Sequence, residues 1–197
     1  MIERGPATED EMVLAFLRAE IDSSRFDDFV KQGLAQMGLT RRLIAEPNVV
    51  DAVENSARKA LLDSFRGYER RNLLFLGFPL DVAWRRVALE DDDFRALRYA
   101  NHPTWCQLSD GTRLVSTGAQ NFGQRPDDPD LYQINGILEA LRHGVHFAEL
   151  IAAEDNSGGL ILIEGASRAT AYLIDRYFQG VEVLVASSPS MPGWHWY

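Results

Sequence analysis

The chain has 197 residues, 46% of them hydrophobic, and its 20 basic and 29 acidic residues give a net charge of −9. This length supports one domain with an extension, and the negative charge disfavours duplex DNA as a partner, because DNA binding needs cationic groups that replace counterions. One cysteine excludes an internal disulfide framework, and the absence of a signal-peptide pattern and of an apolar run near 18 residues predicts a cytoplasmic protein with no membrane partner.

The first third of the chain is predicted to be helical. Thr8 and Glu11 have the spacing of a capping box, and an apolar stripe at helical spacing follows them. A second stripe runs over residues 24–38 and a third over residues 48–67, and both end at glycines. We interpret the three stripes as core rather than as a groove for a partner.

The segment from residue 82 to residue 122 gives weaker signals. It predicts a strand at 82–89 and then a short helix that Asp91 caps. The Ser-Asp-Gly-Thr sequence at 109–112 is turn chemistry, and Arg113 directly after it is a possible ligand contact. A turn followed by a solvated arginine is the plainer interpretation. Cys106 lies beside apolar residues, where a small side chain suits a core, so we expect it to have no chemical role.

Three elements are predicted next, a helix and two strands, at residues 130–142, 147–153 and 160–163. A turn at 155–159 (Asp-Asn-Ser-Gly-Gly) joins the two strands as a hairpin. His143 and His146, with Glu149 nearby, have a spacing that could ligate a metal. A histidine at a helix C-terminus is more often stabilised by the helix dipole, and we favour that interpretation.

The most informative segment is the change from strand to helix after Ile163. A sharp turn of this kind leaves N–H groups unpaired at the helix start, where the helix dipole also favours an anion. Gly165 permits the turn, Ser167 and Thr170 supply hydroxyl donors, and Arg168 supplies a forked cation suited to phosphate. An ordinary corner, with Ser167 as N-cap and Arg168 in solvent, explains the spacing about equally well.

The residues Glu164-Gly165-x-x-Arg168-x-x-Ala171 after a hydrophobic strand resemble the phosphate-binding box of the ParB/sulfiredoxin-like fold. The resemblance covers residues 130–186, and we extend it back to Phe78. It implies an α+β fold with a small mixed sheet and flanking helices. We accordingly divide the chain into a helical extension at 1–76, which packs on the rest, and a ParB/sulfiredoxin-like domain at 77–197.

The box also departs from its relatives. Sulfiredoxins have a catalytic cysteine between the glycine and the arginine, where this chain has Ala166 and Ser167, so their repair chemistry is not expected here. The chromosome-partitioning members add a second arginine and a basic helix-turn-helix, and neither is apparent. Members that resemble free-serine kinases often have histidine at the position of Ser167.

The resemblance implies a nucleotide (ATP, ADP or CTP) or a phosphorylated small molecule as the ligand. We expect Gly165, Ala166, Ser167, Arg168 and Thr170 to hold its phosphate, and phosphoryl transfer or nucleotide hydrolysis to be the reaction. In this scheme Glu164 and Arg168 are catalytic, and Glu164 orients Mg²⁺ or the attacking hydroxyl, unless it only pairs with Arg168 and shapes the turn.

Two other functions stay open. The first is a non-catalytic, nucleotide-responsive module, in which the ligand reorganises the helical extension or a homodimer. The second, a DNA-associated accessory or nuclease, is disfavoured by the charge. The aromatic tail at 194–197 is predicted to dock onto the fold or into an oligomer contact, because its rings have large areas to bury. A base-stacking platform is the less common use of such residues.

Overall fold

The computed structural model describes residues 1–197 apart from 126–127, 129–130 and 177–179. Across the described residues, strands join in one mixed sheet with the order β1-β2-β6-β4-β5-β3. Their bounds are β1 Ile2–Ala7, β2 Ala83–Ala88, β3 Arg98–Tyr99, β4 Leu150–Glu154, β5 Leu160–Glu164 and β6 Glu182–Ser187. The β1–β2, β2–β6 and β4–β5 pairs are antiparallel, whereas β4–β6 and β3–β5 are parallel.

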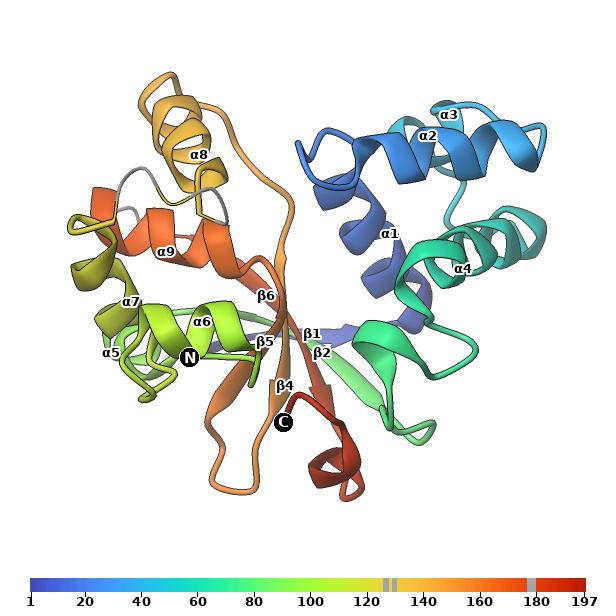
Figure 1. Ribbon diagram of the computed structural model, residues 1–197. Helices are drawn as coiled ribbons and strands as arrows, with labels where there is room; N and C mark the ends of the chain where they lie inside the picture. The colour runs from blue at the N-terminus through green and yellow to red at the C-terminus, as the bar shows by residue number, and fades with distance from the viewer. Residues whose placement is uncertain (126–127, 129–130, 177–179) are drawn as a thin grey trace.

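Helices cover both faces of the sheet, as Figure 1 shows. One face carries α1 Glu9–Glu20, α2 Asp27–Gln36, α3 Arg42–Ala45 and α4 Ala52–Arg66. The other carries α5 Asp91–Ala96, α6 Pro103–Leu108, α7 Val115–Phe122, α8 Gln133–Arg142 and α9 Ala166–Asp175.

Alternate strand residues fill two separate cores, because successive side chains of a strand point to opposite faces. In β5, Ile161 and Ile163 pack with the α1–α4 helices, and Leu160 and Leu162 pack with the helices of the other face. The predicted α+β class, a mixed sheet with flanking helices, is confirmed. So is the expectation that the N-terminal helices pack on the rest of the chain. The narrower ParB/sulfiredoxin-like assignment stays a prediction.

Strand β1 is the main element that the sequence did not predict. Its residues Ile2–Ala7 form an edge of the sheet and pair with β2, so the first 76 residues are not purely helical. Gly5 and Pro6 disfavour a strand, but an edge strand tolerates a proline, and the pairing register shifts between Glu3 and Gly5. The distant partner β2 therefore decides the conformation of this segment, rather than its own propensity.

Local capping signals in the helical third were correct only in part, because α2 begins after Phe26 with no side-chain cap, rather than at residue 24, and Asp51, rather than residue 48, caps α4. Thr8 and Glu11 form both bonds of the capping box at α1, and Gly67 ends α4 in the left-handed conformation. The apolar stripes are only partly core, since Phe29 and Val53 are 55% and 79% exposed. No helix in the described part of the chain combines the length and apolar character needed to cross a membrane.

Between residues 82 and 122, the predicted strand is β2 and the predicted short helix is α5. The capping residue is Glu90 rather than Asp91, and the helix ends at Ala96 because Arg98 and Tyr99 leave it to pair with β5 as β3. The predicted hairpin between β4 and β5 is confirmed, with the side chain of Asp155 accepting bonds from the N–H groups inside the turn.

The aromatic tail docks onto the fold, as predicted. It follows the 3₁₀ helix η2 (Met191–Gly193) and lies against a second one, η1 (Leu73–Phe75). Trp194 is 2% exposed, packs edge-on against Phe78, and donates its indole N–H to the carbonyl of Leu74 at 2.8 Å.

Candidate anion site at the β5–α9 turn

The turn between β5 and α9 requires glycine. Gly165 has φ = 94°, in the left-handed region, and its carbonyl accepts from the N–H of Ala169 at 2.8 Å. A Cβ at this position would lie 2.4 Å from Cδ2 of Leu150 and 3.1 Å from Nη2 of Arg168. A side chain at this position would therefore clash with Leu150, and the guanidinium of Arg168 lies beside the Gly165 backbone.

The start of α9 is left without a side-chain cap in the described part of the chain. Gly165 is the N-cap residue, so the alternative in which Ser167 caps the helix is wrong. The first N–H groups of the helix, beginning at Ala166, have no acceptor inside the helix, and the positive end of the helix dipole lies at the same place. This helix start can accept an anion.

Arg168 is buried rather than solvated, which corrects the plainer of the two sequence interpretations. The residue is 6% exposed, and its guanidinium donates to the carboxylate of Glu164 and to the carbonyl oxygen of Ala148. A longer bond of 3.4 Å reaches the carbonyl of Glu149. The ion pair with Glu164, which the sequence left as an alternative to metal binding, is present.

Burial raises the pKa of the Glu164 carboxyl, and the carboxylate of Glu20 adds to this increase. The guanidinium groups of Arg168 and Arg66 act in the opposite direction. The side chain of Glu164 is 14% exposed. Glu164 is therefore a partly compensated buried acid, whose charged form depends on the arginines around it.

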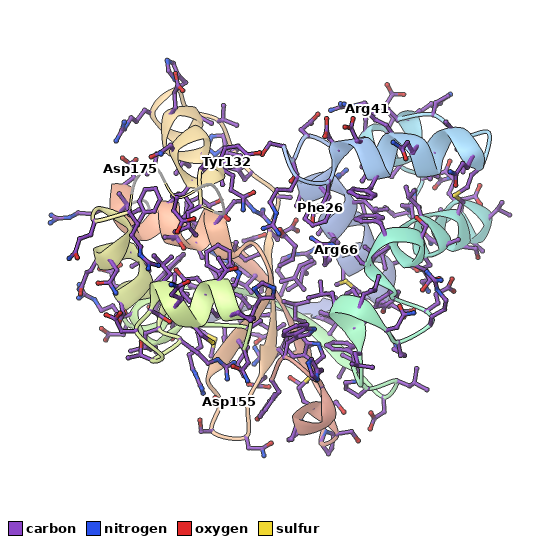
Figure 2. The ribbon with its side chains drawn as sticks, in the orientation of Figure 1. Phe26, Arg41, Arg66, Tyr132, Asp155 and Asp175 are labelled. Carbon is purple, nitrogen blue, oxygen red and sulfur yellow. The ribbon has the colours of Figure 1, made fainter. Side chains whose placement is uncertain are left out.

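A second ion pair, between Glu20 and Arg66, acts on the pKa of Glu164 through its charges. It joins the last residues of α1 and α4, and Glu20 is 4% exposed. The guanidinium of Arg66 also stacks 3.6 Å from the ring centre of Phe26, and Figure 2 places the two residues together on the α1–α4 side of the sheet. Sequence reasoning missed this pair, although Glu20 follows Phe16 by four residues and so lies on the buried stripe of α1.

Ser167 and Thr170 differ in their availability to a ligand. Ser167 accepts from the side chain of Gln133 at 2.6 Å, which ties the start of α8 to the start of α9. Thr170 is fully buried, and its hydroxyl is bonded to Tyr99 and to the carbonyl of Ala166. Thr170 therefore stabilises the packing of α9. Its hydroxyl is not available for the predicted contact with phosphate.

Arg113 is not brought to the turn. Its guanidinium instead donates to the main-chain oxygens of Tyr99, which pairs with Leu162 in the middle of β5, and of Tyr197, both at 3.0 Å. The hydroxyl of Tyr197 in turn accepts from the N–H of Asn156 in the β4–β5 hairpin. Burial lowers the pKa of Arg113, and the charge of Arg98 lowers it further. Arg113 therefore holds the docked tail, and its role as a ligand contact stays a prediction.

The donor chemistry does not fit Mg²⁺. Among the described residues, no group of three or more acidic, histidine or cysteine side chains is arranged to hold a metal ion. Glu164 is paired with Arg168, and a ring nitrogen of His143 is bonded to the carbonyl of Glu139 at 2.8 Å, consistent with its expected place at the end of α8.

A cavity of about 250 Å³ borders the same region. The segment from His146 to Glu149 forms one wall, and Tyr172 and the start of β6 form others. Its acidic lining residues Glu149 and Glu182 both pair with Arg86, and the cavity is not part of the proposed anion site. Comparisons of the chain with family models, curated proteins and solved structures found no match, and the site is described by its own geometry.

Proposed function

We propose that the β5–α9 turn binds the phosphate of a nucleotide or of a phosphorylated small molecule. The observation that carries this proposal is the position of Arg168, whose guanidinium lies against Gly165 at the uncapped start of a helix. Backbone N–H groups, the positive end of a helix dipole and an arginine thus lie at one turn, and this combination of groups binds phosphate in many proteins.

The ligand must compete with Glu164 for Arg168. A phosphate group carries more negative charge than a carboxylate and has three acceptor oxygens, so it can bind the arginine and the helix start together. A neutral side chain at position 164 competes less strongly with the ligand for the guanidinium of Arg168. Ligand binding should therefore be at least as tight in a variant whose Glu164 is an amide.

Binding without turnover is the function that we favour over phosphoryl transfer. Glu164, the expected catalytic carboxylate, is committed to Arg168, and the described residues offer no set of metal ligands beside it. The ion pair of Glu20 and Arg66, at the ends of α1 and α4, contributes to the charge environment of this carboxylate. This electrostatic influence supports a module that responds to its ligand by a change in the α1–α4 helices.

Calorimetric titrations with inorganic phosphate, ADP, ATP and CTP, each with and without Mg²⁺, test the proposal. We expect binding by the parent protein and by Glu164→Gln. Replacing Arg168 with glutamine in that second background should weaken binding by about 1.5–3 kcal/mol, while a neutral hydrogen-bonding pair remains. Glu154→Gln is the matched control, because Glu154 pairs with Arg85 at 2.6 Å at the other end of β4.

The proposal fails if correctly folded parent protein and Glu164→Gln both bind none of these ligands. It also fails if the control variant Glu154→Gln changes affinity as much as Glu164→Gln does. Release of inorganic phosphate from ATP or CTP at a rate that depends on Glu164 would establish turnover instead. Duplex DNA serves as a negative control ligand, since the charge of −9 disfavours it.

A further inference from the structure

The hydroxyl of Ser167 is held by a residue from outside its own helix. Its oxygen accepts the amide N–H of Gln133, the first residue of α8, at 2.6 Å. We propose that Gln133 is a positioning residue of the anion site, which fixes this hydroxyl so that its proton is donated to a ligand phosphate. This inference rests on the proposed function, and it adds α8 to the elements that form the site.

The hydroxyl proton of Ser167 has no acceptor in the described part of the chain. A serine or threonine hydroxyl in a helix can bond the carbonyl four residues earlier, as Thr170 does with Ala166. For Ser167 that earlier residue is Ile163, which belongs to β5. Ser167 is 8% exposed, so water reaches it poorly, and a buried donor without an acceptor is unfavourable. A bound anion would supply the missing acceptor.

The place of Ser167 in α9 directs its hydroxyl toward the start of the helix. Ser167 is the second residue of α9, and side chains of a helix lean toward its N-terminus. The N–H groups without a helical acceptor lie at the same end. The hydroxyl proton thus adds a side-chain donor to the backbone donors of the turn.

A glutamine amide suits this positioning role. Its N–H group occupies a lone pair of the hydroxyl oxygen and leaves the hydroxyl proton free, whereas a carboxylate at position 133 would accept that proton and also repel an anion. The rest of α8 is anchored independently, because Ile134, Leu138 and Leu141 pack in the core of that face. The amide can therefore be replaced without loss of the helix.

A double-mutant cycle on the affinity for inorganic phosphate, measured by calorimetry, tests the inference. Ser167→Ala should weaken binding about tenfold, the effect of losing one hydrogen bond to a charged group. Gln133→Met, which keeps the side-chain length, should weaken it about threefold to fivefold, and by less than about twofold in the Ser167→Ala background. Gln133→Ala should behave in the same way as Gln133→Met. Gln36→Met is the matched control, since Gln36 is exposed at the end of α2.

The cycle separates positioning from a structural effect of α8, which would weaken binding equally in both backgrounds. Equal effects would therefore overturn the inference. A higher affinity of Gln133→Met would also overturn it, because Ser167 would then donate its proton to the amide oxygen. Unchanged affinity in Ser167→Ala would overturn it as well, while the backbone N–H groups and Arg168 would remain the site. Absence of phosphate binding in the parent, in Glu164→Gln and in every folded variant would overturn both the inference and the proposed function.

Discussion

Replacing Arg168 with methionine keeps most of the buried aliphatic volume and removes the guanidinium. The substitution leaves Glu164, a carboxylate that is 14% exposed, without its bonded partner, and it deprives the carbonyl oxygen of Ala148 of a donor. Breaking a buried ion pair by removing one member costs about 3–5 kcal/mol, and we expect the free energy of unfolding to fall by this amount at pH 7. Adding Glu164→Gln to this variant should recover part of the loss, because no buried charge then remains.

Urea unfolding at several pH values measures the effect. The pKa of Glu164 is raised above 4.5 in the folded protein, and without Arg168 it should rise further. The folded variant then binds a proton more tightly than the unfolded chain does, so its stability should fall as the pH rises from near 4.5 through the raised pKa. The cost of Arg168→Met should accordingly be smaller at pH 5 than at pH 7. A cost below about 1 kcal/mol, or no recovery in the double variant, would refute the reasoning.

Three further predictions concern the surroundings of the site. Gly165→Ala should destabilise the protein by well over the roughly 1 kcal/mol expected for a left-handed glycine, because the new Cβ would meet Leu150. Gly144→Ala is the control in the same thermal unfolding assay, and it should show only the smaller cost, because Gly144 is also left-handed but has open space around it. Trp194→Ala should lower the free energy of unfolding in urea by about 3–5 kcal/mol, and a loss under 1 kcal/mol would show that the tail is not part of the core. Cys106→Ala should leave ligand affinity within a few-fold of the parent by calorimetry; complete loss of binding with an unchanged melting temperature would give the thiol a role.

The parts of the fold that the sequence predicts are those with local causes. Thr8 and Glu11 cap each other within one helical turn, and Asp155 organises its own hairpin, so neighbouring residues suffice to identify both. Strand β1 depends instead on β2, whose residues follow it by about eighty positions, and no local pattern reports that pairing. Gly5 and Pro6, taken locally, even disfavour a strand.

The candidate site also combines features with local causes and features that depend on residues distant in the sequence. Glu164 and Arg168 are four residues apart across the β5–α9 turn, and their pairing was open to sequence reasoning. The carbonyl of Ala148 and the ion pair of Glu20 and Arg66 come from elements that only the folded sheet brings together. Burial of Arg168 follows from those distant contacts, which is why the sequence left a solvated arginine as an equal alternative.

The most direct test of the anion site is a titration with inorganic phosphate followed by amide nitrogen–proton NMR. The proposed function predicts that the amide signals of Ala166, Ser167 and Arg168 move together and saturate, and that they move at lower phosphate concentration in Glu164→Gln. Signals that stay in place at the start of α9, while the rest of the spectrum responds only to ionic strength, would contradict the proposal. The β5–α9 turn would then be a structural corner held by a buried ion pair.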